Sequence, residues 1–190
     1  MAAKTQDDFK LVRSAQQGKL EAFTTLYERY LPTVFRRVRY IIPEQDVEDV
    51  TQEIFIEVMK SLHSFRFESQ FSTWLRTLAN RQVADYYRRN AARRSHLQTT
   101  GIQEESELNQ SSKMSPQLIS QQTDLDNTVM LRSALAELPE AYREIILLRF
   151  AEGLQFNEIA ISIGKSLDAA KSLFRRAVAE LKEQMEPIHE

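Results

Sequence analysis

The sequence contains no cysteine and few glycines, and these absences exclude several classes of protein. Without cysteine, the 190-residue chain cannot form disulfides, thiolate metal sites, iron–sulfur clusters or a thiol nucleophile. It contains 4 glycines, no two of them close enough in sequence to form a phosphate-binding loop. The 3 histidines are scattered along the chain, so we expect no metal site and no cofactor. Most familiar kinds of enzyme are therefore excluded.

Long apolar runs are also missing. The longest uninterrupted aliphatic stretch, residues 145–148, is far shorter than a membrane span. The N-terminal segment MAAKTQDDFK lacks the apolar core of a secretory signal. We therefore expect a cytoplasmic protein with no membrane insertion of its own.

An excess of basic residues is absent as well. Lysine and arginine number 25 against 27 aspartate and glutamate residues, which gives a net charge of −2 and a pI of about 6.0. A free-standing nucleic-acid binder usually carries a clear basic excess. Any role in DNA binding must therefore be local or assisted by a partner.

Apolar residues recur with the period of an α-helix along most of the chain, which predicts an all-α fold. In the first half, Asp7 or Asp8 is expected to cap a short helix that stops at Gly18. Three further helices are predicted there, at about residues 20–40 (with Pro32 inside), 44–62 and 72–89. In the second half, helices are predicted at about 128–137 and 140–151, followed by two more.

Residues 96–127 differ in composition from both flanks. They contain one basic and five acidic residues, no aromatic residue, and many Gln, Ser, Thr and Asn. Such a segment buries too little apolar surface to offset the entropy lost on ordering. We predict a flexible acidic linker that joins two small helical domains, residues 1–95 and residues 128–190.

The second domain has the spacing of a helix-turn-helix. An apolar face at residues 156–163 is followed by Gly164 at a turn and by Ser166, which can cap the next helix. On that helix the polar face consists of Lys171, Ser172, Arg175 and Arg176. By itself this face is equally typical of a solvated surface and of DNA recognition. The preceding turn favours DNA.

The helix at 44–62 carries two different stripes. Its predicted buried stripe consists of Val47, Val50, Ile54, Val58 and Leu62. A second side carries four carboxylates, from Asp46, Asp49, Glu53 and Glu57. That stripe is either a solvated face or a docking surface for a basic partner, and the apolar Ile56 outside the core stripe favours docking.

In the segment from residue 65 to residue 94, aromatic residues alternate with seven arginines. Aromatic platforms beside cations are typical of proteins that hold single-stranded nucleic acid. We expect Phe71, Trp74 and Leu78 to belong mostly to the core, but core packing does not require so many arginines around it. Asp85 falls on the same side as Leu78 and requires a polar partner.

Several of these motifs occur together at the spacing of one family. DVTQE at residues 49–53 with Met59 and Lys60 resembles the polymerase-binding helix of sigma-70 factors. FSTWL at residues 71–75, with Ala79, Asp85 and Arg88, resembles their −10 promoter helix. A third set of residues resembles the −35 module of the family: Leu138-Pro139, Glu158-Ile159-Ala160, Gly164, Ser166, Lys171, Ser172 and Arg176. The chain lacks a large middle domain and so is similar to the extracytoplasmic-function (ECF) branch.

The resemblance implies three sets of site residues. Those for binding the core polymerase are Asp49, Gln52, Glu53, Ile56 and Met59. Those for the −10 element are Phe65, Arg66, Phe67, Trp74, Arg76, Asn80, Arg81 and Arg88. Those for the −35 element are Ser166, Asp168, Lys171, Ser172, Arg175 and Arg176.

The function implied by the resemblance is that of an ECF sigma factor, which directs core RNA polymerase to promoters and helps to open the −10 element. The partners implied are core RNA polymerase, promoter DNA and an inhibitory anti-sigma factor. The resemblance implies no catalytic activity and no small-molecule substrate.

The chain departs from the family pattern at two places. It has Ala79-Asn80-Arg81 where many relatives have Ala-Arg-Asn, so either Asn80 or Arg81 is expected to face the −10 base. It has Asp168-Ala169-Ala170 where Gly-Thr-Val is common, which places a carboxylate near the DNA. That carboxylate either accepts a hydrogen bond from a cytosine amine or lies in solvent.

The length of the linker bears on affinity. Two promoter elements about 20 base pairs apart are separated by roughly 65–70 Å. A flexible coil of the linker's 32 residues typically spans only about 28–34 Å, although fully extended it reaches roughly 105–115 Å. The linker must therefore be held extended on the polymerase, and we expect the isolated chain to bind promoters weakly.

Two other functions remain possible on the sequence alone. A stand-alone helix-turn-helix regulator would usually dimerise and bind a palindrome without help. A helical adaptor protein would use its basic faces only as solvated surfaces. Neither accounts for the acidic stripe, the arginine-rich aromatic segment and the tethered helix-turn-helix together.

Overall fold

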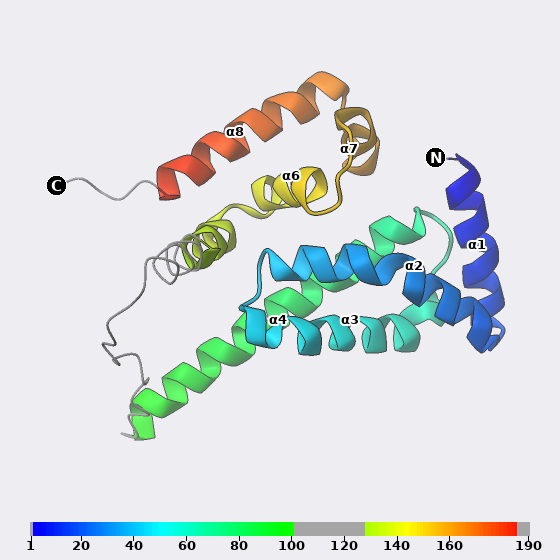
Figure 1. The fold of residues 1–190 in the computed structure, drawn as a ribbon, viewed down its shortest axis with the longest axis horizontal. Coiled ribbons are helices and arrows are strands. Elements are labelled where there is room, and N and C mark those ends of the chain that lie inside the picture. Colours follow the sequence, from blue (N-terminus) through cyan, green and yellow to red (C-terminus); the bar gives the residue numbers. More distant parts are fainter. Residues whose placement is uncertain (1, 101–127, 186–190) are drawn as a thin grey trace, which may run out of the picture.

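The computed structural model describes residues 2–100 and 128–185 (Figure 1). Within these two ranges every regular element is a helix and no strand occurs, which confirms the predicted all-α fold. None of the described helices is long and apolar enough to cross a bilayer. Most of the predicted linker, residues 101–127, lies outside the described residues.

We refer to residues 2–100 as the N-terminal unit. Its α-helices are α1 (Ala2–Gln16), α2 (Leu20–Arg39, with Pro32 inside), α3 (Val47–Ser61) and α4 (Phe71–Thr100). Short 3-10 turns, Glu44–Asp46 and Leu62–Ser64, flank α3. Along the chain α1 packs on α2, α2 on α3 and α3 on α4. The predicted helices at 20–40 and 44–62 are confirmed.

The apolar stripe of α3 is buried as predicted. Val47, Val50, Ile54, Val58 and Leu62 are each no more than 5% exposed. Their spacing of three or four residues places them on one side of the helix, so that they meet α2 and α4 together. The opposite side of α3 is thereby turned to solvent.

The first helix differs from its prediction. It begins at Ala2, so neither Asp7 nor Asp8 caps it, and that expectation was wrong. Asp8 instead lies inside α1, buried, and accepts hydrogen bonds from Arg29 and Tyr30 of α2. The carboxylate fastens α1 to α2, a contact between helices that local sequence does not reveal. The helix ends before Gly18, as expected.

The helix α4 is longer than predicted. Leu75, Leu78 and Val83 are buried along its first half, and this part packs against α3 and α2. From Arg88 onward its described side chains are mostly exposed, yet the helix continues to Thr100, beyond the expected end at residue 89. Figure 1 shows this second half extending past the other helices of the N-terminal unit.

We refer to residues 128–185 as the C-terminal unit. Residues 128–137 are helical and are followed by α6 (Glu140–Phe150), α7 (Phe156–Ser162) and α8 (Leu167–Met185). The break at Leu138-Pro139 occurs where it was predicted. Both α6 and α7 pack against α8, and the predicted helix-turn-helix is formed by α7 and α8. The Ser166 hydroxyl accepts a hydrogen bond from the Ala169 amide at 3.2 Å and so caps α8 as expected.

The turn between α7 and α8 is made by Gly164, which has a φ of 65°. The Lys165 amide donates to the Ala160 carbonyl and the Gly164 amide donates to the Ile161 carbonyl. This pair of bonds closes the helix with a residue in the left-handed conformation, which glycine adopts without steric cost. The turn sets the direction in which α8 leaves the scaffold.

Replacing Gly164 with alanine is expected to lower the free energy of unfolding by about 1–2 kcal/mol. A Cβ at this position meets no atom within 4 Å, so the cost is conformational and not steric. Urea unfolding followed by circular dichroism measures it. Gly164→Asn is the control and should cost less, because asparagine tolerates the left-handed region. Equal losses for the two variants would contradict this account.

The apolar cores of the two units touch. Leu147 of α6 and Ala151, the residue after that helix, are buried in the core of the N-terminal unit. Tyr40 at the end of α2 also packs against the core of the C-terminal unit. In Figure 1 the helices α6 and α7 lie on the side of the N-terminal bundle that is formed by α2 and α4. The C-terminal unit therefore covers one side of the N-terminal bundle.

Candidate functional site

The outward side of α3 carries the residues predicted to bind polymerase. Asp49 and Gln52 are exposed and Glu53 is half-buried. Ile56 and Met59, one turn apart, are 47% and 57% exposed although both are apolar. Exposed large apolar side chains that share a helix face are a common mark of a protein-binding surface.

The acidic stripe of α3 is partly satisfied within the chain. The Tyr86 hydroxyl donates to Asp46 at 2.6 Å, Arg89 pairs with Glu53 at 2.6 Å, and the Ser61 hydroxyl donates to Glu57 at 2.7 Å. Asp49, by contrast, is exposed. The acidic stripe is therefore neither simply solvated nor wholly available to a partner. The apolar pair beside it, Ile56 and Met59, is the stronger indication of a docking surface.

A groove next to Met59 was not predicted from the sequence. It has a volume of about 290 Å³ and lies between the start of α2 and the end of α3. Leu20, Phe23, Met59 and Leu62 line it, and Leu20 is 73% exposed. The apolar surface on α3 thus continues onto α2. The signal available in the sequence was an apolar residue directly after Gly18-Lys19, outside any buried stripe.

The loop between α3 and α4 holds a cluster of aromatic rings. Phe65 is buried, and its ring centroid lies 5.3 Å from Trp74 and 5.0 Å from Phe67. Phe71 is also buried and contacts Trp74. The expectation that Phe71 belongs to the core is confirmed. Phe65 forms the floor of the cluster, and the half-buried Phe67 and Trp74 lie closer to its surface.

Phe67 has an unusual backbone. Its φ is 62°, and no other non-glycine residue in the described ranges has a positive φ. A bulky residue in this conformation is strained and persists only where its surroundings hold it. Here the Arg13 guanidinium lies 5.4 Å from the ring centroid and Phe9 packs edge-on at 5.4 Å. The loop is thus held in one shape with the exposed Arg66 beside it.

The remaining predicted −10 residues lie along α4. Arg81 is exposed, whereas Arg88 pairs with Asp85, which gives that carboxylate the partner it was expected to need. Arg76 is buried, and Asn80 on the next turn exchanges hydrogen bonds with other side chains. Phe67 and Trp74 are half-buried and Arg66 and Arg81 are exposed, whereas Arg76 is buried and Asn80 is engaged by other side chains.

The predicted −35 residues gather at the start of α8. Ala170 and Ala177 fix one side of the helix in the core of the C-terminal unit. On the free side, the exposed residues are Ser166, Asp168, Lys171, Arg175 and Arg176, and Ser172 is half-buried. Three cations with one carboxylate suit contact with phosphates and the acceptor atoms of guanine.

Two families match separate parts of the chain. The family described as Sigma-70 region 2 matches residues 26–93, which include α3, the aromatic loop and most of α4. The family described as Sigma-70, region 4 matches residues 128–181, which include the helix-turn-helix.

The relatives extend over nearly the whole chain. The ECF RNA polymerase sigma-E factor of Escherichia coli (strain K12) is 31% identical over 185 residues, covering 95% of this chain and 95% of the relative. The chain belongs to the sigma-70 family, in its ECF subfamily. This sigma factor therefore directs RNA polymerase to promoters as a DNA-binding initiation factor, and the stand-alone regulator is not favoured.

Two further similarities agree with this assignment. The ECF RNA polymerase sigma factor BldN of Streptomyces coelicolor is 32% identical over 174 residues, which cover 90% of this chain and 63% of BldN. The solved structure of CnrH in complex with the cytosolic domain of CnrY is similar, with a TM-score of 0.61 and 25% identity. That match covers 93% of this sigma factor and 96% of the CnrH chain.

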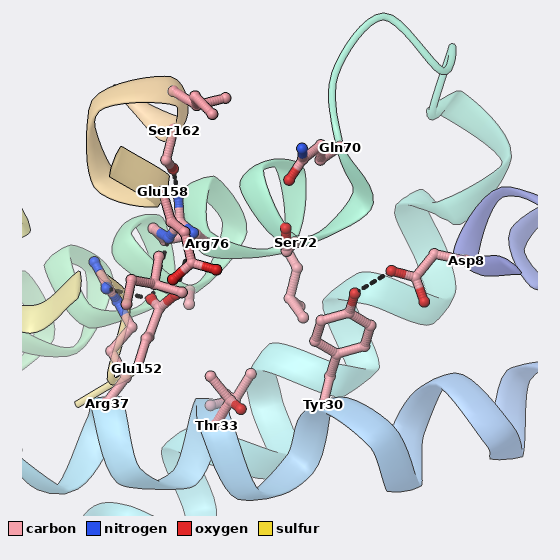
Figure 2. Close-up of a pocket in the computed structure, with 15 residues that line it drawn as sticks. Asp8, Tyr30, Thr33, Arg37, Gln70, Ser72, Arg76, Glu152, Glu158 and Ser162 are labelled. Atoms are coloured by element: carbon pink, nitrogen blue, oxygen red, sulfur yellow. Dashed lines mark hydrogen bonds and ion pairs between the residues drawn. The ribbon is translucent and has the colours of Figure 1, made fainter. Parts of the chain in front are cut away.

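A charged cluster between the two units was missed by reasoning from the sequence. Arg37 of α2 and Arg76 of α4 are 3% and 9% exposed, and both contact Glu144 and Glu152 of the C-terminal unit. Figure 2 shows the guanidinium of Arg76 between Glu152 and Ser162. One signal was available, because Arg37 follows Tyr30 and Val34 of the buried stripe of α2 at helical spacing.

Burial raises the pKa of Tyr30, Tyr86 and Tyr87, and two of these tyrosines, Tyr30 and Tyr86, are also hydrogen-bonded to a carboxylate. Burial and the hydrogen bond to Asp46 raise the pKa of Tyr86 to about 12. Burial, with the hydrogen bond to Asp8, also raises the pKa of Tyr30. In both cases the low-dielectric surroundings and the neighbouring carboxylate disfavour the phenolate.

We expect the sigma factor to lose stability as the pH rises from about 10 to about 12. In that window the unfolded chain releases the Tyr86 proton while the folded chain keeps it, so deprotonation favours unfolding. Tyr86→Phe removes the hydrogen bond to Asp46 and should cost about 1 kcal/mol at neutral pH. It should also reduce this alkaline slope without removing it, because the raised pKa values of Tyr30 and Tyr87 contribute to the same slope. Urea unfolding at a series of pH values measures both effects. Identical slopes for the two proteins would contradict the assignment.

Proposed function

We propose that this sigma factor uses three separate surfaces: α3 to bind core RNA polymerase, the aromatic loop with α4 to open and hold the −10 element, and α8 to read the −35 element. Each surface differs in chemistry from the other two. The surfaces proposed for polymerase and for single-stranded DNA both belong to the N-terminal unit. The duplex contact lies on the other unit.

The polymerase contact is centred on Ile56 and Met59. Burial of two exposed apolar side chains against a partner supplies the favourable free energy. Asp49 and Gln52 beside them supply polar contacts at the rim of the polymerase interface. Glu53 also lies there, but its carboxylate already pairs with Arg89 within the chain. The groove beside Leu20 extends the same surface. A basic, partly apolar surface on the polymerase fits this combination.

The −10 contact uses the loop and the accessible side of α4. Unstacking a base from the duplex costs a few kcal/mol. Stacking on an aromatic side chain recovers about 1–3 kcal/mol per base, and Phe67 and Trp74 offer such surfaces above the buried Phe65. Arg66 and Arg81 are placed to contact the backbone of the displaced strand. The strained Phe67 backbone supports a preformed pocket.

The −35 contact uses the first turns of α8 in the major groove. Lys171, Arg175 and Arg176 supply cations, and the helix N-terminus near Ser166 favours a phosphate. Asp168 would accept a hydrogen bond from a cytosine amine. The buried alanines on the opposite side hold the helix at a fixed depth against its scaffold.

Other properties follow from this proposal. The sigma factor has no catalytic activity, binds no cofactor, and acts in the cytoplasm, where the polymerase is found. Core RNA polymerase and promoter DNA are its partners. A further partner is an anti-sigma factor, for which the exposed apolar side of α3 is a suitable target.

The observation that carries the proposal is the arrangement of these surfaces on helices that belong to the two matched sigma-70 regions. The test is transcription in vitro from fragmented genomic DNA, with core polymerase in the presence and absence of the chain. The 5′ ends of the RNA are sequenced. We expect new start sites that share two upstream elements separated by about 20 base pairs.

Binding of the chain to core polymerase is measured in parallel. Failure both to bind core polymerase and to produce new starts would refute the proposal. Tight, specific binding of a promoter by the chain alone would also contradict it, since the net charge of −2 and the divided DNA surface predict weak unaided binding.

A further inference from the structure

The contact between the two units is built around buried charges. Arg37 donates to Glu152 at 2.8 Å and also pairs with Glu144. Arg76 donates through two nitrogens to the two carboxylate oxygens of Glu152, each at 3.1 Å, and its third nitrogen donates to Ser162 at 2.8 Å. Figure 2 shows Arg37 of α2, Arg76 of α4 and Ser162 of α7 gathered around Glu152.

The cluster is balanced in charge and specific in geometry. The N-terminal unit contributes two guanidinium groups and the C-terminal unit two carboxylates, so the contact is neutral only when both units are present. The fork of Arg76 on Glu152 is a bidentate pair, which fixes orientation as well as distance. A buried ionic group left without its partner is strongly disfavoured. The cluster therefore selects one docked arrangement over other ways of packing the units.

Contacts around the cluster extend the same interface. Leu147 of α6 and Ala151, directly after it, enter the apolar core of the N-terminal unit. Arg132, on the helix at 128–137, donates to the Arg39 carbonyl at 3.1 Å and to Glu44 at 3.0 Å. Contacts of both apolar and polar kinds thus come from two helices of the C-terminal unit, as expected of a specific docking contact.

Docking occupies Arg76 and Asn80, two of the residues that the family resemblance implies for the −10 element. Every guanidinium nitrogen of Arg76 has a partner in the C-terminal unit. The Asn80 amide donates to Glu144 at 3.1 Å and its carbonyl accepts from Arg37 at 2.9 Å. Neither side chain is available to a nucleotide in this arrangement.

Docking also limits how far the proposed −35 residues of α8 can lie from α4. Ser162 lies 2.8 Å from Arg76, and the five residues from it to the start of α8 span at most about 18 Å. The ten residues from Ser166 to Arg176 add about 15 Å along the helix. The proposed −35 residues therefore stay within about 36 Å of α4, whereas the two promoter elements are roughly 65–70 Å apart.

We infer that the free sigma factor rests in a closed form, in which Glu144 and Glu152 of the C-terminal unit dock on Arg37 and Arg76 and thereby shield part of the −10 surface. Binding of promoter and polymerase requires this contact to open. The inhibitory consequence rests on the proposed function. The docking itself does not, and the two are tested by separate measurements.

The absence of cysteine makes the docking measurable. Thr24→Cys on α2 and Lys182→Cys on α8 are exposed positions outside the three proposed surfaces, and spin labels attach there alone. Double electron–electron resonance on the full chain then reports the distance between the units. The closed form predicts one narrow distance distribution for the labelled protein without DNA or polymerase.

The opening variant combines Glu144→Gln and Glu152→Gln. Glutamine preserves shape but leaves the two arginines uncompensated if the units remain docked, so the units should separate and the distance distribution should broaden. Both changes lie outside the residues proposed to contact DNA or polymerase. The matched control is Glu137→Gln with Glu183→Gln, two exposed glutamates of the same unit. Circular dichroism verifies that the helices of each variant remain folded.

Inhibition is tested with labelled single-stranded DNA of about 12 nucleotides of random sequence, by fluorescence anisotropy on the full chain. If the closed form outnumbers the open one by about ten to one, the opening variant should bind about tenfold more tightly than wild type. The control should bind as wild type does, although it carries the same change in net charge.

A broad distribution in the wild-type protein, or a narrow one in a folded opening variant, would overturn the docking inference. An opened variant that binds DNA no more tightly than the control would overturn the inhibition. The proposed function is tested by different measurements, namely binding to core polymerase and the appearance of new transcription starts. If both of these fail, a docking contact measured by spin labels still stands.

Discussion

Transcription from promoters of this sigma factor is expected to fall by on the order of 100-fold or more when Arg175 and Arg176 are both replaced by alanine. Each arginine that reads a guanine through two hydrogen bonds contributes about 1–3 kcal/mol, and a change of about 1.4 kcal/mol is tenfold in affinity. Both guanidinium groups are exposed on the free side of α8. Their loss should leave the fold intact.

The physical reason is the separation of tasks between the two sides of α8. Ala170 and Ala177 are fully buried and hold the helix to its scaffold, so the loss of Arg175 and Arg176 removes contacts to DNA without loosening the helix. Arg175 donates to Ser172 at 3.2 Å within the same side, a bond that is solvent-exposed and weak. The unfolding free energy should therefore change by only a few tenths of a kcal/mol.

Lys182→Ala is the matched control. Lys182 is an exposed cation in the last turn of the same helix, outside the proposed DNA contact. Run-off transcription with reconstituted holoenzyme measures both variants, and titrations of a −35 duplex at several salt concentrations test the contact directly. If one of the two arginines contacts phosphate instead of a base, its removal should reduce the salt slope by about one. Equal activity of R175A/R176A and Lys182→Ala would contradict the assignment of α8.

The parts of the fold that follow from local sequence were predictable. The stripe of Val50, Ile54 and Val58 carries its own period, so it fixes both the existence of α3 and the side that is buried. The turn at Gly164 and the cap at Ser166 are signalled by residues adjacent in sequence. Family resemblance then assigns roles to the sides of helices that the periodicity leaves exposed.

The parts that depend on distant contacts were not predictable. Asp8 looked like a helix cap because its partners, Arg29 and Tyr30, are more than twenty positions away. The pairing of Arg37 with Glu144 joins residues 107 positions apart. Nothing in either local pattern specifies the other residue. For Arg76 and Asn80 the sequence predicted nucleic-acid contact, and their engagement by the C-terminal unit required the structure.

Binding to core RNA polymerase is expected to weaken by on the order of 100-fold or more in the double variant Ile56→Asp with Met59→Asp. Central apolar residues of protein interfaces often contribute 2 kcal/mol or more each when truncated. Aspartate adds the cost of placing a carboxylate against an apolar partner. Both side chains are about half exposed in the free chain, so their replacement removes little from the core of the N-terminal unit.

Val129→Asp serves as the control for adding a carboxylate at an exposed apolar position. Val129 is 61% exposed on the helix at 128–137 and is not one of the residues proposed to bind polymerase. Titration of labelled sigma factor with core polymerase measures the affinity of each variant, and circular dichroism verifies the fold. An affinity for the α3 variant equal to that of the control would show that polymerase binds elsewhere.

The same titration separates the apolar from the acidic contribution of α3. Asp46, Glu53 and Glu57 are engaged by Tyr86, Arg89 and Ser61, so their neutralisation would disturb contacts within the chain. Asp49 is exposed, and Asp49→Asn therefore reports on the partner alone. We expect a smaller loss than for the apolar pair, and one that shrinks at high salt because exposed charges are screened. A loss larger than that of the apolar variant would instead make the acidic stripe the main polymerase contact.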